Sequence, residues 1–567
     1  MSTCMFQNPT PPSHWHGTIT TTSLPSACVQ SREDFKYIRE HAPFYDGSMD
    51  EDCLYLNIYV PVILSKKGLF PVLVHVHGGS NMAGMGAMFH GDVLASEGEM
   101  IVVTFNYRLA ALGFLSIPDL DIAGNFGIFD QLQALRWVSE NIANFGGDPG
   151  KVTLQGHSAG STDVGLHLLS PLSQVYFQRA ILQSGSPTVD WALMSRREET
   201  DAYSGPRSHL VALGCQDRVD GHRTLRCLRE VDARTLAETR YNYTQGYHHF
   251  TPVIDGVMIV SNPVGSNLQD KVKAEAVMMG LVKDEGSLTA EVIMRSEHPT
   301  VNDTDDARPA QPLDIPYDEV LKMIVDFYPR LQFHTFAADL IQLLYKPWSD
   351  PDNITAKALA LSEFCGDIVF NSATLQFADM LREVPQLDLF LYRFEHRSTL
   401  SIHPQWIGVP HGDDLFYLFG CPLDGHPVRS YTHLDRKVSL KLIETWSSFV
   451  HTGWPSKNKT TSQVQPFSPD ESYFIIDNNG TDATITKGNH LRAQFHKFWN
   501  SFIPLLASPP PSPAGSDTVR LVLIVCVCLL LVFCVGLAVC FVYYRRLVKS
   551  SAVIAQTEAE ANGVCKT

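Results

Sequence analysis

The sequence lacks several features that mark other classes of protein. No run of Lys and Arg interleaved with aromatic residues is present, and the 567 residues carry a formal net charge of −16. Because phosphate binding requires a basic patch, this acidic composition argues against a nucleic-acid partner. No repeat period is visible, and no spacing of His, Cys, Asp or Glu is typical of a metal site. We therefore expect one large globular domain that needs neither a metal nor another cofactor.

One long segment lacks charged residues entirely. The 24 residues at 521–544 contain no Asp, Glu, Lys or Arg. A helix of this length, at about 1.5 Å per residue, crosses a hydrocarbon core of roughly 30 Å. Two tyrosines and two arginines at 543–546 mark its end, and the positive-inside rule places the basic flank in the cytosol. The sequence therefore predicts a single-pass type I protein of the plasma membrane: an extracellular domain at 1–506, a Pro/Ser-rich stalk at 507–520, a transmembrane helix at 521–544 and a cytosolic tail at 545–567.

The N-terminus lacks a signal peptide, although an extracellular domain must be exported. Residues 1–13 contain no apolar run, so we expect a truncated N-terminus rather than a span that drives its own orientation. Glycosylation sequons agree with an extracellular location, because all five N-x-S/T tripeptides lie on the predicted outer side. The expected glycosylation sites are Asn242, Asn302, Asn353, Asn458 and Asn479.

Cysteines also fit an oxidising compartment. Seven of the 12 cysteines precede the predicted span. The short separations between Cys28 and Cys53, and between Cys215 and Cys227, favour two local disulfides. The pairing of the other three, Cys4, Cys365 and Cys421, is left open.

Apolar runs bounded by turn residues predict the strands. A helix is expected at 132–145, followed by a Gly-rich turn at 146–150. Strands that alternate with helical stretches indicate a mainly parallel sheet with helices on both faces. The expected strands are residues 70–76, 100–105, 152–155, 179–183, 275–282 and 387–394.

The motif that carries the chemistry is G-x-S-x-G at 156–160, between a predicted strand and a predicted helix. A serine on such a sharp turn projects its hydroxyl into a cleft, and the flanking glycines are needed because side chains would not fit. The following helix directs N–H groups toward a developing negative charge. Ser158 is therefore the candidate nucleophile.

Residues 145–160 (FGGDPGKVTLQGHSAG) resemble the serine signature of the type-B carboxylesterase/cholinesterase family, and residues 51–57 (EDCLYLN) resemble its second signature. The motifs NYR at 106–108 and GNFG at 124–127 resemble family motifs that lie between the two. The similarity runs from about residue 6 to residue 506. It implies an α/β-hydrolase fold, with a mostly parallel, twisted central sheet flanked by helices.

The resemblance also implies the partners of Ser158, because this fold carries its acid and its histidine later in the chain. His411, in GVPHGDDL, resembles the histidine of the family loop, and His403 is a weaker alternative. The acid follows the predicted strand at 275–282, where Asp284 and Glu285 stand side by side. The family pattern D-E-G-S favours Glu285.

Backbone N–H groups of Gly79, Ser80 and Ala159 are expected to form the oxyanion hole. Related esterases commonly have Gly where this chain has Ser80. The N–H donor survives that change, so it affects rate and substrate size rather than mechanism. Loss of one such donor costs roughly 3–4 kcal/mol of transition-state stabilisation.

The sequence thus predicts a serine esterase that acts on a small-molecule ester by a Ser-His-Glu mechanism. Choline esters are disfavoured, because cholinesterases have Glu at the position of His157 and use a tryptophan that the segment 28–53 lacks. The alternative is a neuroligin-like adhesion protein. Neuroligins share the fold, the stalk, the span and the tail but have lost the serine. A homodimer or an extracellular protein partner is left open.

Arg108 and Asp130 resemble a buried family ion pair.

Overall fold

The computed structural model describes residues 5–41, 45, 47–62, 68–194, 206–216, 221–239, 250–296, 311–327, 335–424, 429–459, 463–467 and 470–507. The chain divides into two compact units, Met1–Leu506 and Ala507–Thr567. No helix of the described part is long and apolar enough to cross a membrane. The predicted helix at 521–544 and tail at 545–567 lie outside the described residues, as do Cys4, Asn242, Asn302 and all but Ala507 of the stalk.

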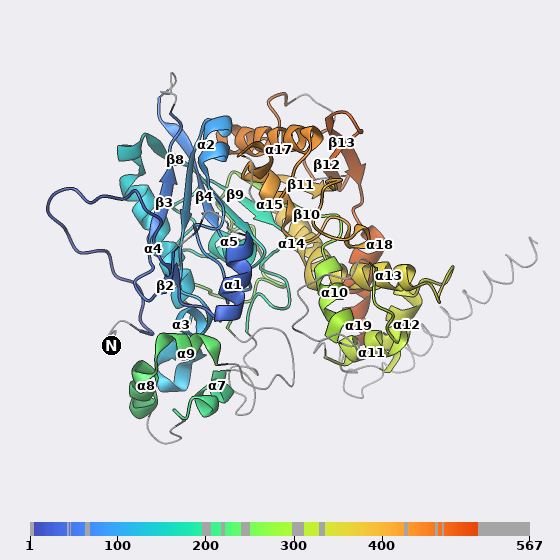
Figure 1. Cartoon of the computed structure of the whole chain (residues 1–567), viewed down its shortest axis with the longest axis horizontal. Helices are drawn as coiled ribbons and strands as arrows, with labels where there is room; N and C mark the ends of the chain where they lie inside the picture. Colours follow the sequence, from blue (N-terminus) through green and yellow to red (C-terminus); the bar gives the residue numbers. More distant parts are fainter. Residues whose placement is uncertain are drawn as a thin grey trace, which may run out of the picture. The chain divides into compact units, whose positions relative to one another are not determined.

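A nine-stranded sheet forms the centre of the first unit (Figure 1). Its order is β13-β12-β11-β10-β9-β8-β4-β5-β3, and the seven inner strands run parallel. The two edge strands are antiparallel to their neighbours. The strands are β3 (Leu56–Tyr59), β4 (Phe70–Val76), β5 (Ile101–Phe105), β8 (Gly147–His157), β9 (Arg179–Gln183), β10 (Ala276–Val282), β11 (Asp388–Phe394), β12 (Ser472–Asn478) and β13 (Ala483–Asn489).

Burial on both faces explains why the inner strands read as apolar runs. In β4, Val72 and Val74 join the cluster of apolar side chains on one face, while Leu73 joins the cluster on the other. Successive side chains of a strand point to opposite faces, so both must be apolar when helices cover both. Helix α5 (Ala159–Leu169) covers the first face and α17 (His433–Thr452) covers the second.

All six predicted strands are present, which confirms the α/β class. Strand β8 is longer than predicted, because residues 147–150 continue the strand and do not form the expected turn. Strands β3, β12 and β13 escaped prediction. In β12 the side chains mostly alternate between buried and half-exposed, and in the two edge strands, β3 and β13, they are half-exposed or exposed. No continuous apolar run therefore marks these three strands.

The predicted helix at 132–145 corresponds to α4 (Phe126–Asn141), which begins and ends earlier. Asn125, at its N-cap, donates to Val253 O at 2.8 Å and to Asp255 Oδ2 at 2.9 Å. The start of α4 is therefore set by contacts with a distant segment, which a local pattern does not contain. The last predicted turn, Ile142–Phe145, is a 3₁₀ helix.

The remaining elements are mostly short and surround the sheet. Two small two-stranded sheets pair β1 (Ala27–Cys28) with β2 (Met49–Asp50), and β6 (Ser116–Ile117) with β7 (Ile122–Ala123). The other α-helices are α1 (Arg32–His41), α2 (Asp92–Gly98), α3 (Ala110–Phe114), α7 (Pro206–Ala212), α8 (Gly221–Glu230), α9 (Ala233–Glu238), α10 (Ser287–Ser296), α11 (Tyr317–Phe327), α12 (Thr335–Tyr345), α13 (Ile354–Gly366), α14 (Ser372–Arg382), α15 (Asp413–Leu418), α16 (Cys421–Asp424), α18 (Ala493–Lys497) and α19 (Ile503–Ala507). Single turns of 3₁₀ helix lie at Pro118–Leu120 and Gln405–Ile407, and turns of π-helix lie at Asp367–Asn371 and Phe498–Phe502.

Both expected local disulfides are formed, Cys28–Cys53 and Cys215–Cys227. Cys365 and Cys421 are free thiols, so the alternative in which these two pair with each other is wrong. Cys365 is buried among apolar side chains, and this burial raises the pKa of its thiol to about 12.

The predicted pair of Arg108 and Asp130 is a buried, two-pronged ion pair. Arg108 Nε donates to Oδ2 and its Nη2 donates to Oδ1, both at 2.7 Å, and the Arg108 backbone N–H adds a third bond at 3.0 Å. The Asp130 side chain is 1% exposed. Burial raises the pKa of Asp130, and the hydrogen bonds and charge of Arg108 oppose that rise. The pair fixes the segment after β5 against α4.

We predict that Arg108→Ala destabilises the protein by about 3–5 kcal/mol, because it leaves a buried carboxylate without its cation. The melting temperature of the full chain should fall by several degrees in a thermal unfolding experiment. Lys151→Ala is the matched control, since Lys151 pairs with Asp148 at 3.2 Å but is 53% exposed. The control should cost less than about 1 kcal/mol. Equal melting temperatures for the two variants would contradict the buried pair.

Candidate active site

Ser158 lies at the turn between β8 and α5, in a backbone conformation that few residues adopt. Its φ is 55° and its ψ is −124°. A non-glycine residue with positive φ is strained and persists only where the surroundings fix it. Here the Ser158 N–H donates to Gln183 O at 2.9 Å, and the Ser158 carbonyl accepts from Ser161 N at 2.9 Å and Thr162 N at 3.0 Å. The Ser158 side chain is thereby directed out of the sheet at the first turn of a helix.

The two flanking glycines of the motif are required by close packing. A Cβ added to Gly156 would lie 2.1 Å from Gly160 O, and one added to Gly160 would lie 2.3 Å from Val76 O. Real Cβ atoms do not approach backbone oxygens so closely, so any side chain here would displace β4 or α5. The G-x-S-x-G pattern is therefore a packing requirement of this turn.

Glu285 and His411 are joined by a short hydrogen bond. Glu285 follows β10 and His411 follows β11, and 2.7 Å separates His411 Nδ1 from Glu285 Oε2. Glu285 is 2% exposed. Its other oxygen accepts from Ser184 Oγ at 2.6 Å and from Val282 N at 2.8 Å. A carboxylate held in this way fixes the orientation and tautomer of the ring that it faces.

Asp284, the neighbour of Glu285, has a different role. Its Oδ2 accepts from Val409 N at 2.8 Å, and its own N–H donates to Val409 O at 3.0 Å. Asp284 thus holds the loop that carries His411, while Glu285 faces the imidazole. His403, the weaker alternative, lies on the same loop, where its carbonyl accepts from Arg397.

The His411 ring is held between two other rings. It stacks on Phe370, with centroids 4.3 Å apart and planes at 23°. On another side lies the His157 ring, with centroids 4.6 Å apart. Within the described residues no hydrogen bond joins Ser158 Oγ to His411, although both lie against His157. Such bonds are often long before substrate binds.

The loop after β4 brings the expected oxyanion donors against the nucleophile. Gly79 has a φ of 111° and Ser80 a φ of 57°. A Cβ placed on the preceding Gly78 would lie 3.0 Å from Ser158 Cβ, so the loop is in contact with the nucleophile. Among the described residues, no backbone carbonyl accepts from the N–H of Gly79 or Ser80. Ala159 is the first residue of α5, where a helix leaves its N–H groups unpaired.

Three buried histidines near the site are held in the neutral form. Burial lowers the pKa of His75 to about 3 and that of His77 to about 4. The pKa of His157 lies well below its ordinary value, mainly because the ring is buried and to a smaller extent because His411 and His75 are close. His75 packs on the edge of Phe419. In the part of the chain that the structure describes, no group of three His, Cys, Asp or Glu could hold a metal ion.

Two residues of the site carry no signal in the sequence. Ser184, which donates to Glu285, lies just after β9 with a φ of 53°. Phe370 lies in the π-helical turn Asp367–Asn371, and its ring stacks on His411. Such turns are frequent at functional sites, but no sequence pattern predicts them.

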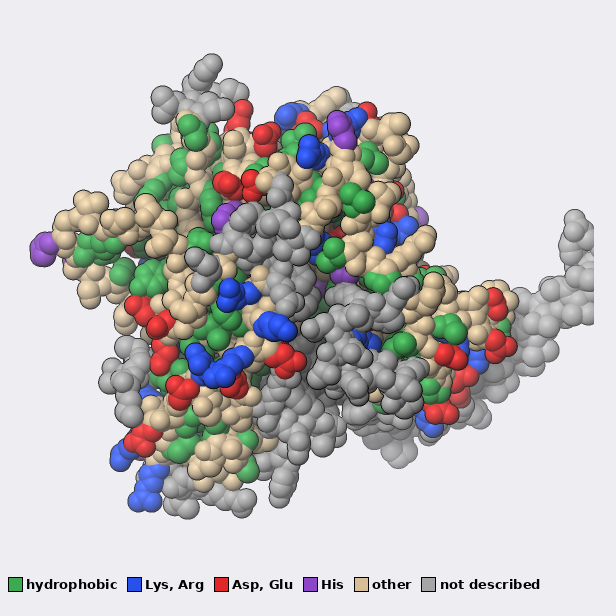
Figure 2. Space-filling view, in the orientation of Figure 1, with side chains coloured by type: hydrophobic (Ala, Val, Ile, Leu, Met, Phe, Trp, Pro, Cys, Tyr) green, Lys and Arg blue, Asp and Glu red, His purple; other side chains and the backbone are tan. Residues whose placement is uncertain are grey.

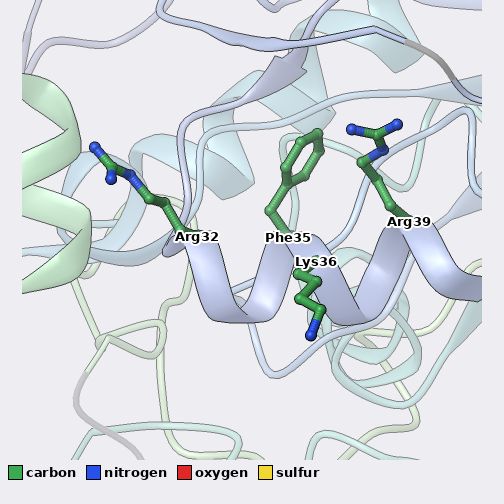
Figure 3. Close-up of a pocket in the computed structure, with 4 residues that line it drawn as sticks. All are labelled: Arg32, Phe35, Lys36 and Arg39. Atoms are coloured by element: carbon green, nitrogen blue, oxygen red, sulfur yellow. The ribbon is translucent and has the colours of Figure 1, made fainter.

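A cavity of about 380 Å³ beside α1 is not the candidate site. It is lined by Arg32, Phe35, Lys36 and Arg39. Lys36 projects to one side of the helix and the other three project to the opposite side (Figure 3). Arg32 pairs with Glu238 at 3.1 Å. On the face in Figure 2, a small group of basic side chains lies over α1, and acidic and basic side chains are otherwise interspersed. The cavity lining contains no nucleophile and no acid–base pair.

The arrangement around Ser158 has the parts that acyl transfer needs. A hydroxyl stands on a strained turn, and a carboxylate-bound imidazole packs on the preceding residue, His157. The loop that contains the expected N–H donors touches the same serine. Together these groups can accept a proton, attack a carbonyl carbon and stabilise an oxyanion.

The chain is similar to known proteins over most of its length. Residues 3–499 match the model of the carboxylesterase family. Acetylcholinesterase of Bungarus fasciatus is 32% identical over 523 residues, which cover 88% of this chain and 80% of that protein. Acetylcholinesterase of Leptinotarsa decemlineata is 29% identical over 539 residues, with the same coverage of 88% and 80%.

A second kind of relative is equally similar. Neuroligin-2 of Mus musculus is 33% identical over 485 residues, which cover 80% of this chain. The matched segment spans 56% of the length of neuroligin-2. Similarity over the shared domain therefore does not by itself separate the two kinds of relative, and the side chains around Ser158 become decisive.

We predict that Glu285→Gln slows the reaction of Ser158 with a fluorophosphonate about a thousandfold or more, because the amide favours the wrong tautomer of His411. Asp284→Asn is the matched control. Its amide oxygen still accepts from Val409 N, so the rate should stay within about threefold of wild type. The measurement is the rate of covalent labelling of the full chain. A larger loss in the Asp284 variant would reverse the roles of the two acids.

Proposed function

Because the chain belongs to the carboxylesterase family, we propose that it is a serine hydrolase that cleaves carboxylic esters at the cell surface. The family has the α/β-hydrolase fold, and the large, mainly parallel sheet with helices on both faces fits it. Membership confirms the resemblance inferred from the two signatures. The observation that carries the proposal is the 2.7 Å hydrogen bond between His411 and a buried Glu285, beside a serine on a left-handed turn.

In the proposed reaction His411 acts first as a base. As Ser158 Oγ attacks the ester carbonyl carbon, His411 Nε2 takes its proton, and Glu285 stabilises the imidazolium. The N–H groups of Gly79, Ser80 and Ala159 donate to the oxyanion. The carbon–oxygen bond of the ester then breaks, and His411 gives its proton to the leaving alcohol.

Water completes the cycle: it is now the nucleophile, and Ser158 is the leaving group. His411 takes a proton from water, whose oxygen attacks the acyl carbon bound to Ser158. The tetrahedral intermediate collapses, the bond to Ser158 Oγ breaks, and the proton returns to that oxygen. The oxygen of the water stays on the acyl carbon as the second oxygen of the acid product, so the atoms balance without any further reactant.

The substrate of this proposal is a carboxylic ester without a quaternary ammonium group. His157 stands next to His411 and is held neutral by burial, so it offers no negative charge to a cation. The segment 28–53 provides Phe35 and Tyr45 but no Trp, which binds such cations best. We therefore place choline esters below uncharged esters in preference.

A second candidate function is neuroligin-like adhesion. The similarity to neuroligin-2 favours it, with 33% identity over 80% of the chain. An extracellular partner, or a second copy of the chain, would then bind the surface of the same domain. The presence of Ser158, Glu285 and His411 favours the esterase, because an adhesion protein gains nothing from a buried carboxylate that orients an imidazole. The two functions are compatible in one chain.

The location at the cell surface rests on separate observations. Two disulfides are formed in the described domain, and disulfides form in oxidising compartments. The apolar segment at 521–544 is the proposed anchor, with the domain at 1–506 outside, the stalk at 507–520 and the tail at 545–567 in the cytosol. The three sequon asparagines that the structure describes, Asn353, Asn458 and Asn479, are all exposed.

The proposal predicts that a fluorophosphonate labels the full chain on Ser158, because the probe reacts only with an activated serine. Labelling of the membrane-bound protein is followed by gel fluorescence, and the modified peptide is identified by mass spectrometry. Ser158→Ala should abolish labelling and ester hydrolysis while leaving the melting temperature nearly unchanged. Ser161→Ala, three residues along, is the matched control and should retain labelling.

An absence of labelling in folded wild-type protein would favour adhesion instead. A panel of short-chain, long-chain and choline esters then separates substrate classes, and a binding screen with cell-surface proteins tests the second candidate directly. Hydrolysis of choline esters at a higher kcat/KM than that of matched uncharged esters would contradict the proposed preference.

We predict N-glycosylation at Asn353, Asn458 and Asn479, since an exported domain presents these exposed sequons to the transferase. Treatment of the full chain with a peptide N-glycosidase should increase its mobility in a gel. Replacing each asparagine by Gln should remove one glycan apiece. Unchanged mobility for all three variants would contradict extracellular exposure of the domain.

A further inference from the structure

A buried network of polar side chains connects the loop after β4 with α5. Asp163, on α5, is fully buried, and its Oδ2 accepts from Gln131 Nε2 at 2.7 Å. Its Oδ1 accepts from Asn81 Nδ2 at 3.4 Å. Asn81 Oδ1 in turn accepts from Tyr107 Oη at 3.3 Å. The chain of contacts therefore runs from α4 through α5 to the loop that carries Gly79 and Ser80.

The loop needs such an anchor because its backbone is strained. Ser80 and Asn81 are consecutive non-glycine residues, each with a φ of 57°. Two left-handed residues in succession are costly, and they persist only where contacts fix them. Backbone contacts supply part of the restraint, because Asn81 O accepts from Ala110 N at 2.8 Å and Gly79 O accepts from Met82 N and Ala83 N at 2.9 Å. None of these backbone bonds reaches α5.

The Asn81 side chain supplies the link to α5. That helix begins with Ala159, directly after Ser158, and Asp163 lies one turn further along. The expected oxyanion donors come from both sides, Gly79 and Ser80 from the loop and Ala159 from the helix. An oxyanion hole works only if its donors lie at fixed positions around the developing charge. The contact between Asn81 and Asp163 spans the gap between the two sides.

We propose that Asp163 is a positioning residue that fixes the loop at 79–81 against the start of α5 through its hydrogen bond with the Asn81 amide. The proposal deepens the esterase function and rests on it for its catalytic consequence, whereas the anchoring itself does not depend on turnover.

Within the described residues, the hydrogen bonds to the Asp163 carboxylate come from the side-chain amides of Gln131 and Asn81. Burial raises its pKa to about 7, and the hydrogen bonds from Gln131 and Asn81 oppose that rise. The ionisable groups around it are neutral at that pH, since burial lowers the pKa of His167 to about 3 and that of His77 to about 4, and raises the pKa of Tyr107 well above its ordinary value. Asp130, which precedes Gln131 on α4, is paired with Arg108.

Because the donors to Asp163 are amides, two substitutions at this position are informative. Asp163→Ala removes the acceptor, so that the amides of Gln131 and Asn81 lose their partner. Asp163→Asn can keep the network if the Asn81 amide rotates by half a turn. The new amide then accepts from Gln131 and donates to the turned oxygen of Asn81. The Asn81 amide nitrogen donates to Tyr107 Oη, and Tyr107 keeps its 2.8 Å bond to His77 O. Asn81→Gly cuts the same contact from the other end and tolerates the left-handed φ.

The test uses the full chain in detergent and two readouts. The first is amide hydrogen exchange of peptides that cover residues 77–84. The second is the hydrolysis of a short-chain nitrophenyl ester, with kcat expressed per Ser158 that a fluorophosphonate titrates. Titration counts only folded sites, so a variant that merely folds poorly keeps its kcat.

Asp163→Ala and Asn81→Gly should each speed exchange in the loop by about tenfold or more. Each should lower kcat by about 10- to 100-fold while KM changes by less than about threefold, because donors that move affect the transition state more than the bound ester. Asp163→Asn should stay within about threefold of wild type in both readouts. The double variant should be no worse than the worse single variant, because both changes cut one contact.

Unchanged exchange in the loop of Asp163→Ala, or losses of kcat in the two single variants that add fully in the double variant, would overturn the proposal. If Asp163→Ala does not fold, Asn81→Gly carries the test, since it leaves Asp163 bound to Gln131. A wild-type chain that neither hydrolyses esters nor reacts with the fluorophosphonate would refute the esterase function alone. The exchange readout would still decide whether Asp163 anchors the loop.

Discussion

The left-handed backbone at Ser158 is the constraint on which the rest of the site depends. At this residue the chain turns from a buried strand into a helix, with a φ of 55°. It makes this turn where Gly156 touches Gly160 and where Gly160 touches the end of β4. Such strain is stable only because β8 is buried between β4 and β9 in the sheet. The large core thus holds one residue in a conformation that it would not otherwise adopt.

Parallel pairing explains how residues so distant in sequence meet. The loops that contain Gly79, Ser158, Glu285 and His411 follow β4, β8, β10 and β11. The carboxyl ends of parallel strands lie at the same edge of a sheet, and sites in such folds form there. The intervening strand β9 contributes Ser184 from the same edge. The loops after five strands therefore supply the site, although these loops lie far apart in the sequence.

Some of this could be predicted from the sequence and some could not, for identifiable reasons. Strands buried on both faces give unbroken apolar runs, so β4 and β9 were predicted with their exact limits of 70–76 and 179–183. The edge strands lack such runs, and α4 starts where Asn125 meets Val253, a contact between distant segments. Motifs located Ser158 and the loops of Glu285 and His411. Phe370 and Ser184 were missed, because a π-helical turn and a side chain on a neighbouring strand leave no local pattern.

Burial also determines where charge can reside as the proposed reaction proceeds. His75, His77 and His157 are kept neutral by desolvation, and the proximity of His411 further disfavours a proton on His157. When His411 takes the proton of the nucleophile, the adjacent ring of His157 therefore cannot share it. Glu285 lies against His411 and is itself held by Ser184 and the Val282 N–H. The positive charge thus stays on the His411 imidazole, and the Glu285 carboxylate that it faces is already held in place before the transfer.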